Sequence, residues 1–281
     1  MKCGIKKYTV IFLALITIIM PSLAESRKSL TDRVKEAVAT PSPTPTPSPT
    51  PTLSPTPTPS PTPLKSKYAI GNTVEFGTYT QGKDGNDQTP IKWIVLDRKG
   101  KNVLLISRYV IDCMPYNNSK TSITWEKSSL RNWLNNFFIK TAFSPDEQSR
   151  IIEVVVDNSK AQGKKISSEG SELTTSGGKD TRDRVFILSY QEAFGVYYAG
   201  PDDFSRRCSA TDYANKKGCY SNEWWVELNG KEATSWWLRS PGTDSKKACV
   251  VNNVGFASDR CDINSKQGIR PAIWISIDSE Y

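Results

Sequence analysis

Residues 126–139 read E-K-S-S-L-R-N-W-L-N-N-F-F-I, and this stretch decides the fold class because a helix pattern lies here between strand patterns. Its apolar side chains recur at i, i+3, i+4, i+7 and i+8, a spacing that places them on one face of a helix. These side chains are Leu130, Trp133, Leu134, Phe137 and Phe138. The spacing predicts a helix over 126–139 that buries this face in the core.

Strand patterns precede this helix. Apolar and polar residues alternate near 74–78 and 91–95, on either side of a turn at 82–89, and residues 103–106 are continuously apolar. Because such patterns are typical of strands, we expect a three-stranded meander. After the helix, the sequence S-P-D-E from Ser144 supplies an N-cap, a first-turn proline and a capping-box glutamate, which predicts a second helix.

Further strand and helix signals follow toward the C-terminus. Apolar runs predict strands at 152–156 and 185–188, and Ser189 with Glu192 forms a capping box for a helix that ends near residue 197. Short strands are expected near 235–239, 248–252, 255–258 and 269–277. This mixed order predicts an α+β fold with antiparallel sheets and two to four helices.

Most large or charged side chains within these elements are expected to be structural. The tryptophans on apolar faces, which we expect in the core, are Trp93, Trp125, Trp133 and Trp274. Trp236 and Trp237 are neighbours in one strand, so one of the two is expected to face inward. Arg239 and Arg270 are expected to hydrogen-bond buried carbonyls or a carboxylate such as Asp183.

Residues 1–24 have the composition of an export signal. Lysines precede an apolar core at 8–20, and the small residues Ser22 and Ala24 fit cleavage before Glu25. An uncleaved anchor is the alternative, although the apolar core is shorter than the ~20 residues that span a bilayer. We therefore expect an extracellular or cell-surface protein that contacts a membrane only through the N-terminal segment, if that segment is retained.

Residues 41–64 are expected to be a disordered, extended spacer. Nearly every second residue is proline, which fixes φ and removes a backbone donor, so the segment can enter neither helix nor sheet. At about 3.1 Å per residue it could reach roughly 70 Å. The spacer separates a short polar segment at 25–40, with apolar residues at helical spacing, from one globular domain at 65–281.

Composition excludes several functional classes. Half of the net charge of +8 lies before residue 65, and the rest of the chain has no basic run, so we expect no nucleic-acid partner. The chain has no histidine, which removes histidine general bases and ordinary zinc sites, and we expect no metal and no cofactor. Carboxylates for a glycosidase pair would have to come from Asp202, Asp203, Glu223 and Glu227. No spacing singles out two of them, and a solvated acidic loop is the alternative reading.

Cysteine spacing suggests two disulfides. The export signal contains one of the six cysteines, so cleavage would leave five. Cys208 with Cys219 and Cys249 with Cys261 are the pairs that close short loops in an oxidising exterior. Cys113 is then expected to be a buried free thiol.

Seven short motifs follow one another along residues 68–277. They are G-T-Y-T-Q (77–81), P-I-K-W-I-V-L-D (90–97), L-L-I-S-R-Y (104–109), T-W-E-K-S-S-L-R-N-W-L-N (124–135), D-R-V-F-I-L-S (183–189), W-W-L-R-S-P-G (236–242) and G-I-R-P-A (268–272). Together they resemble a bacterial extracellular domain family of unknown function. That family has no assigned activity, so the resemblance implies no catalytic residues.

A helix-bearing front half and an aromatic back half that closes on the I-R-P-A strand are also similar to the C-type-lectin-like fold, including its formylglycine-generating enzyme branch. The resemblance implies a single lectin-like domain. The copper site of the enzyme branch uses two nearby cysteines, whereas Cys249 and Cys261 are twelve residues apart, a spacing that suits a hairpin disulfide better. The W-N-D motif of calcium-dependent lectins is absent.

Trp224 and Trp225 are the candidate recognition residues. They lie in the polar stretch S-N-E-W-W-V-E-L-N-G (221–230), where an exposed indole would suit stacking on a sugar ring. Packing of both rings at the edge of the core is the alternative. Asn252 and Asn253, in an N-N-V-G turn between two strands, complete the candidate binding residues.

These features predict an exported, surface-presented binding module without catalytic residues. We expect it to bind cell-wall or extracellular polysaccharide, because spacers of this composition often precede polysaccharide-directed modules. One alternative is an extracellular enzyme, either a carboxylate glycosidase or a thiol or copper oxidase centred on Cys249 and Cys261. The other is a protein-binding adhesion module.

Overall fold

The computed structural model describes residues 67–163, 167–168, 171–172, 176–198, 204–219, 227–228 and 230–277. All described residues lie within Pro61–Tyr281, one of the two units into which the chain divides. The predicted export signal, polar segment and spacer therefore lie outside the described residues. Within the described part of the chain, no helix is both long enough and apolar enough to cross a membrane.

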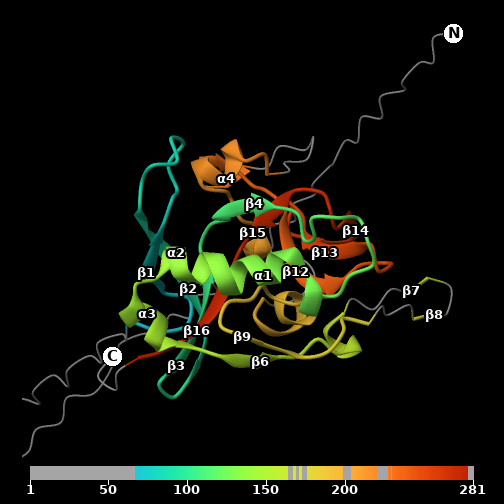
Figure 1. Cartoon of the computed structure of the whole chain (residues 1–281), viewed down its shortest axis with the longest axis horizontal. Coiled ribbons are helices and arrows are strands. Elements are labelled where there is room, and N and C mark those ends of the chain that lie inside the picture. Colours follow the sequence, from blue (N-terminus) through green and yellow to red (C-terminus); the bar gives the residue numbers. More distant parts are fainter. Residues whose placement is uncertain are drawn as a thin grey trace, which may run out of the picture. The chain divides into compact units, whose positions relative to one another are not determined.

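Two five-stranded sheets form the framework of the domain (Figure 1). The first has the order β1-β2-β3-β16-β5, and all its neighbouring strands are antiparallel. Its strands are β1 (Thr73–Tyr79), β2 (Thr89–Lys99), β3 (Asn102–Ser107), β16 (Ala272–Ser276) and β5 (Ile151–Ile152). The meander predicted from residues 74–106 is confirmed as β1, β2 and β3.

The second sheet has the order β14-β13-β12-β15-β4. Its strands are β14 (Ala257–Asp262), β13 (Lys247–Val251), β12 (Trp236–Pro241), β15 (Gln267–Ile269) and β4 (Asp112–Met114). The β12–β15 pair is parallel and the other pairs are antiparallel. Together with the helices, these sheets confirm the α+β class.

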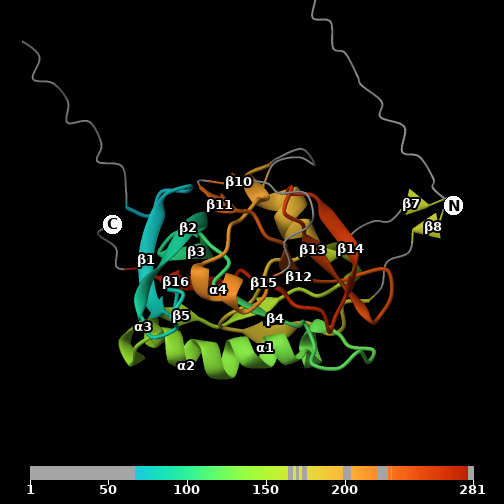
Figure 2. The same ribbon diagram turned by 90° about the horizontal axis from the view of Figure 1, so that it is seen from above.

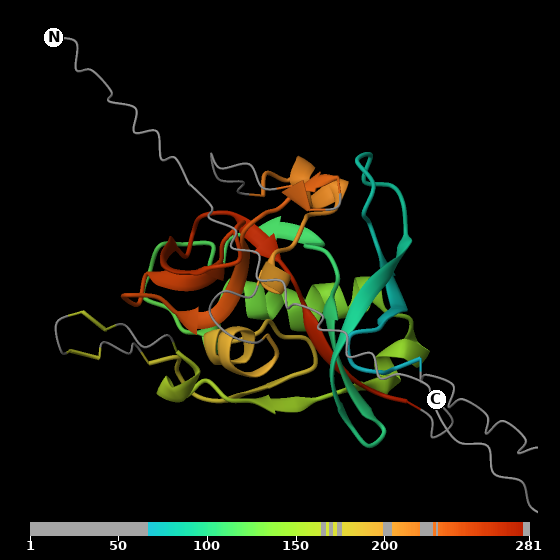
Figure 3. The ribbon, with the colours of Figure 1, turned by 180° about the vertical axis from the view of Figure 1, so that it is seen from behind.

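One predicted strand, 269–277, is shared between the two sheets. β15 and β16 are separated by Arg270 and Pro271, and Figure 3 shows this red segment running from one sheet into the other. Pro271 has no backbone N–H and so interrupts the ladder. Its carbonyl accepts a hydrogen bond from the Ser107 backbone N–H at 2.9 Å. This short connection ties the second sheet to the first.

Three short strand pairs complete the sheet structure. They are β6 (Val154–Val156) with β9 (Thr181–Asp183), β7 (Ser167–Ser168) with β8 (Ser171–Glu172), and β10 (Glu227–Leu228) with β11 (Lys231–Glu232). The strand predicted at 152–156 is divided between β5 and β6. The strand predicted at 185–188 is wrong, because this buried segment makes only a bridge from Phe186 to Ala272. Its apolar run indicates burial, not a ladder.

The helical segments within residues 125–150 lie along one side of the domain (Figure 2). They begin with η1 (Trp125–Lys127), α1 (Ser129–Trp133), the π-helical turn η2 (Leu134–Phe138) and α2 (Ile139–Ala142), followed by α3 (Pro145–Arg150). The remaining segments are η3 (Lys160–Gln162), the π-helical turn η4 (Glu192–Val196), η5 (Phe204–Arg206) and α4 (Asp212–Lys216). The helix predicted over 126–139 is confirmed, but it contains a π turn.

Both predicted capping boxes are present. The Ser144 backbone N–H donates to Glu147 Oε2 at 2.9 Å, and the Glu147 N–H donates to Ser144 Oγ at 3.3 Å. The corresponding distances for Ser189 and Glu192 are 2.9 and 3.0 Å. The reciprocal bonds satisfy backbone donors that the first helical turn leaves unpaired.

The tryptophan core differs in part from the prediction. Trp93 and Trp125 are fully buried, as expected. Trp236 and Trp237 are both fully buried, because β12 lies inside its sheet and both of its faces are covered. Trp133 and Trp274, expected in the core, are only partly buried.

The two strand arginines are structural, as predicted. Arg239 donates to the carbonyl oxygens of Ile187 at 3.0 Å and Asp157 at 3.1 Å, and Arg270 donates to the Ser107 carbonyl at 2.8 Å. The carboxylate beside Arg239 belongs to Glu192. Asp183, which we had expected in that role, instead accepts from Arg131 Nε at 2.6 Å and from Trp125 Nε1 at 3.0 Å.

Candidate ligand-binding sites

A hollow of about 530 Å³ lies over the outer surface of α1 and η2. We call it the aromatic hollow; its lining includes Met114, Asn118, Asn132, Trp133, Asn136 and Phe137. Two aromatic rings and three primary amides therefore gather on one surface of the helical segment.

The two rings of the aromatic hollow are stacked and fixed from below. The rings of Trp133 and Phe137 have centroids 6.2 Å apart and an interplanar angle of 27°. Trp133 also stacks on the fully buried Phe138, at 5.4 Å and 28°. Phe137 remains 55% exposed. An exposed ring thus rests on a second ring that the core holds in place.

The π turn explains why these rings are not in the core. Each residue of an α-helix advances by about 100°, which would put Phe137 in the middle of the apolar face. In η2 the Ile139 N–H donates to the Leu134 carbonyl, five residues back, so each residue advances by less. This rotation brings Phe138 to the middle of the buried face and moves Phe137 to its edge, beside Trp133. The prediction that Trp133 and Phe137 face the core is therefore wrong for Phe137 and only partly right for Trp133.

The asparagines of the aromatic hollow retain hydrogen-bonding capacity. Asn136 donates to Asn132 Oδ1 at 2.8 Å and to the Asn132 carbonyl at 3.0 Å. This arrangement leaves the Asn132 amide nitrogen and the Asn136 amide oxygen without a partner among the described residues. Asn118 is also exposed. A ligand at the rings would meet both donors and acceptors.

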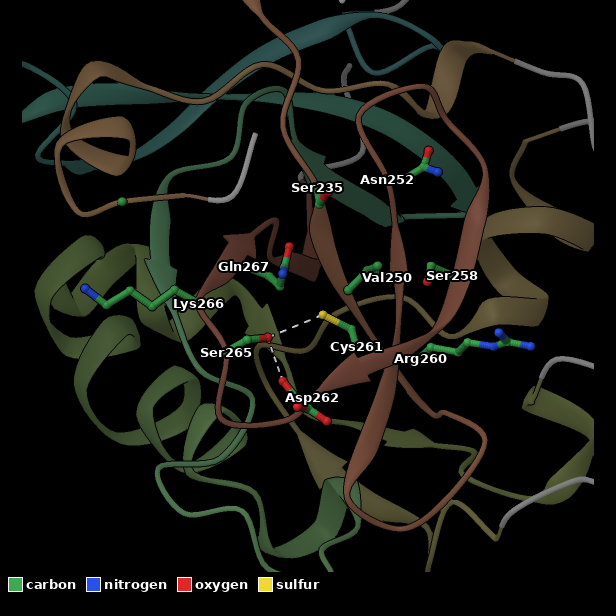
Figure 4. Close-up of a pocket in the computed structure, with 11 residues that line it drawn as sticks. Ser235, Val250, Asn252, Ser258, Arg260, Cys261, Asp262, Ser265, Lys266 and Gln267 are labelled. Carbon is green, nitrogen blue, oxygen red and sulfur yellow. Dashed lines mark hydrogen bonds between the residues drawn. The ribbon is translucent and has the colours of Figure 1, made fainter. Parts of the chain in front are cut away.

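A second hollow, of about 640 Å³, lies over strands β13, β14 and β15 (Figure 4). We call it the strand hollow; its lining includes Asn252, Ser258, Arg260, Cys261, Ser265 and Gln267. Figure 4 shows Cys261 and Ser265 directed toward each other, with Sγ and Oγ 3.4 Å apart. Gln267 is only 4% exposed, and its Oε1 has no hydrogen-bond partner in the described part of the chain.

The thiol in the strand hollow is a poor nucleophile. Burial raises the pKa of Cys261, against the opposing effect of hydrogen bonds from Ser265 and Gln267. The group is therefore protonated at neutral pH, whereas thiolate is the reactive form. This electrostatic setting disfavours thiol chemistry at Cys261.

The predicted binding residues have different fates. Asn252 lines the strand hollow, but its Oδ1 accepts from the backbone N–H groups of Val254 at 3.1 Å and Phe256 at 2.9 Å, so it also holds the predicted turn. Asn253 is fully buried, which differs from its predicted role on a binding surface. Trp224 and Trp225 lie outside the described residues.

The acidic residues considered for catalysis are not brought together in the described structure. Asp202, Asp203 and Glu223 lie outside the described residues, and Glu227 begins β10. Within the described part of the chain, no group of three or more cysteine or carboxylate side chains is arranged to hold a metal ion.

The cysteines differ from the predicted disulfide pattern. Cys113, Cys208, Cys219, Cys249 and Cys261 are all free thiols. In the β13–β14 ladder the partner of Cys261 is Ala248, and the Cys249 thiol donates to the Pro241 carbonyl of β12 at 3.2 Å. Cys208 Sγ donates to the Arg108 carbonyl at 3.3 Å, while Cys219 Sγ donates to the Asp112 carbonyl at 3.8 Å. Neither predicted pair therefore forms a disulfide, although its two cysteines are close in the sequence. Cys113 is a buried free thiol, as expected.

Comparison with known protein families matches residues 100–277 to the family described as "Domain of unknown function (DUF6273)". No curated protein and no solved structure matches the chain. The matched residues extend from just before β3 to the end of β16 and include both hollows.

Proposed function

The chain belongs to this family of domains of unknown function, and we propose that it is an exported protein whose domain binds polysaccharide, without catalysis, at the aromatic hollow. The observation that carries the proposal is the exposed Phe137 ring, stacked on Trp133 and flanked by asparagine amides. A sugar ring presents C–H groups on its faces and hydroxyl groups at its rim. The aromatic rings would pack against the faces, and the amides would bind the hydroxyl groups.

Export is supported by the sequence. Residues 1–24 have the pattern of a secretory signal, and the spacer at 41–64 would hold the domain away from its point of attachment. Cell-wall or extracellular polysaccharide would be the ligand available there. The lectin-like arrangement is part of the same proposal and is supported by the helices around α1 and α2 and by the tryptophans of β12 and β16.

Binding is favoured over glycoside hydrolysis by the distribution of carboxylates. Hydrolysis needs two carboxyl groups on either side of the bond that is broken. None of the described residues that line the aromatic hollow is a carboxylate. In the strand hollow, Asp262 is engaged by Lys120 at 2.7 Å. Neither hollow therefore offers the required pair.

The direct test compares binding of the purified chain and its variants to insoluble polysaccharides, peptidoglycan and a glycan array. Phe137→Ala is expected to weaken binding about tenfold, because an aromatic contact contributes roughly 0.5–1.5 kcal/mol beyond its buried area. Phe256→Ala is the matched control, since Phe256 is also exposed, at 42%, but lies in the β13–β14 turn. It should bind as the wild type does.

Trp225→Ala separates the aromatic hollow from the site predicted from sequence. Loss of binding in Trp225→Ala with full binding by Phe137→Ala would move the site to residues 224–225. Equal binding by all variants would refute the assignment to aromatic side chains, and absence of binding to every polysaccharide would refute the proposed function.

A further inference from the structure

Two cysteines that are far apart in the sequence lie in contact in the fold. Cys113 belongs to β4 and is 1% exposed, whereas Cys219 follows α4 and is partly exposed. An interaction of the Cys219 thiol with Cys113 is the largest of the effects that raise the pKa of Cys219, which places the two thiols within reach of each other. Cys219 Sγ also donates to the Asp112 carbonyl at 3.8 Å, which places this sulfur over the peptide bond that leads into Cys113.

Charged contacts hold Cys219 in this position independently of the sulfur atoms. Lys217, two residues before Cys219, forms an ion pair with Asp112, the residue before Cys113. The second carboxylate oxygen of Asp112 accepts from the Tyr79 hydroxyl at 2.7 Å. Lys266 Nζ donates to the Lys217 carbonyl at 3.0 Å. The backbone on both sides of the contact is therefore fixed.

A glycine turn directs the chain after α4 toward β4. Gly218, between Lys217 and Cys219, has a φ of +86°. This left-handed conformation carries a steric cost for residues with a Cβ, and glycine is the usual residue that ends a helix in this way. The local sequence K-G-C thus combines the ion-pairing lysine, the turn and the thiol.

We propose that Cys113 and Cys219 form a disulfide when the exported domain meets an oxidising thiol–disulfide partner, such as oxidised glutathione or a disulfide-carrying oxidoreductase. The partly exposed Cys219 loses its proton and attacks one sulfur of the partner's disulfide, which releases the first thiol. Cys113 then loses its proton and attacks the Cys219 sulfur of the mixed disulfide, which releases the second thiol. Two cysteine thiols are oxidised, and one partner disulfide is reduced to two thiols.

The remaining cysteines make contacts of a different kind. Cys208 Sγ donates to the Arg108 carbonyl at 3.3 Å, Cys249 Sγ to the Pro241 carbonyl at 3.2 Å, and Cys261 Sγ lies 3.4 Å from the Ser265 hydroxyl. Each of these sulfur atoms contacts an oxygen, whereas Cys219 contacts both the Asp112 carbonyl and the Cys113 thiol. The contacts in the fold therefore identify Cys113 and Cys219 as a pair, whereas the number of residues between cysteines favours other pairs.

The setting of the pair favours a structural link over a catalytic one. The hydrogen bond with Cys113, followed by burial, raises the pKa of the Cys219 thiol. Catalytic cysteines in exchange reactions have lowered pKa values, so this thiol reacts slowly. A bond between positions 113 and 219 would close a long loop and restrict the unfolded chain, which stabilises the fold.

The test equilibrates the purified full chain in buffers with excess oxidised glutathione, blocks free thiols by alkylation under denaturing conditions, and maps peptides by mass spectrometry. We expect one linked peptide pair, joining Cys113 to Cys219, with Cys208, Cys249 and Cys261 alkylated. Linkage of Cys208 to Cys219 or of Cys249 to Cys261 would overturn the proposal. So would alkylation of both Cys113 and Cys219.

Variants provide a second readout that does not depend on ligand binding. The urea midpoint of the oxidised wild type should exceed that of the reduced protein, and this difference should vanish in Cys113→Ser. Cys261→Ser, which leaves the pair intact, is the matched control and should retain the difference. Equal midpoints for oxidised and reduced wild type would contradict the proposed link, while polysaccharide binding by the reduced protein would still test the proposed function separately.

Discussion

Replacement of Arg239 by methionine is expected to destabilise the domain by about 3–5 kcal/mol, the range for a buried ion pair that loses one partner. The Arg239 side chain is 1% exposed and donates to Glu192 Oε1 at 2.8 Å, as well as to the carbonyls of Ile187 and Asp157. Methionine has a similar length but no donor. The buried Ile187 carbonyl and the partly buried Asp157 carbonyl would each lose a partner, at up to roughly 1–1.5 kcal/mol. The Glu192 carboxylate, which is 22% exposed, accounts for the rest because water reaches it only in part.

Urea unfolding followed by tryptophan fluorescence measures this effect. For an m value of about 2–3 kcal/mol/M, the loss lowers the urea midpoint by more than about 1 M. Arg239→Lys should fall between the wild type and Arg239→Met, because lysine keeps the charge but cannot donate to two carboxylate oxygens in a planar fork. Combining Arg239→Met with Glu192→Gln should cost less than the two single changes added together, since the second change removes the unpaired charge. A loss below about 1 kcal/mol in Arg239→Met would refute the assignment of Arg239 as a structural centre of this region.

Two further predictions concern single side chains. Partial burial acts to raise the pKa of Glu147, but the backbone N–H groups of Ser144 and Gly77 outweigh it and hold this pKa below its ordinary value. A carboxyl group whose pKa is lowered in the folded state stabilises the fold above its ordinary pKa. The stability advantage of the wild type over Glu147→Gln should therefore be lost as the pH falls through the lowered value. Urea midpoints of both proteins between about pH 7 and about pH 3 measure this loss, and a difference that does not change with pH would contradict the prediction. Gln267→Met removes the unpaired buried oxygen in the strand hollow together with the hydrogen bond to Cys261, so the two effects should offset and change the free energy of unfolding by less than about 1 kcal/mol. Thermal unfolding measures the change, and a larger loss would contradict the view that this oxygen is unpaired.

The elements that depend on local sequence were predictable. Period-two alternation identified β1 and β2, and the S-P-D-E sequence identified the start of α3. The predicted strands at 152–156 and 269–277 were each divided, because a change of sheet depends on which distant strand is adjacent. Residue 152 pairs with β16, whereas 154 pairs with β9. A single sequence carries no signal for that change.

The contacts between cysteines likewise could not be predicted from the sequence. Loop length favours the cysteines that are nearest in sequence, and it selected Cys208 with Cys219. The contact in the fold joins Cys219 to Cys113, because the Lys217–Asp112 ion pair brings the end of α4 to β4. Both charges are visible in the sequence, each close to its cysteine. Only the tertiary structure shows that they meet.

The aromatic hollow was missed because its residues satisfy a helix pattern. Burial of a phenylalanine side chain contributes roughly 1.5–3 kcal/mol, and a regular helix would have buried Phe137. By turning this ring outward to 55% exposure, η2 forgoes about half of that stabilisation. π turns occur often at functional sites, so an exposed ring at this turn is in keeping with the proposed polysaccharide site. The sequence did contain one local signal: Asn132-Trp133 and Asn136-Phe137 repeat an amide–aromatic pair after four residues, which places amides and rings side by side along one edge of the helix. A helix face that only packs in the core would not require asparagines at its edge, whereas the proposed polysaccharide site would use both the amides and the rings.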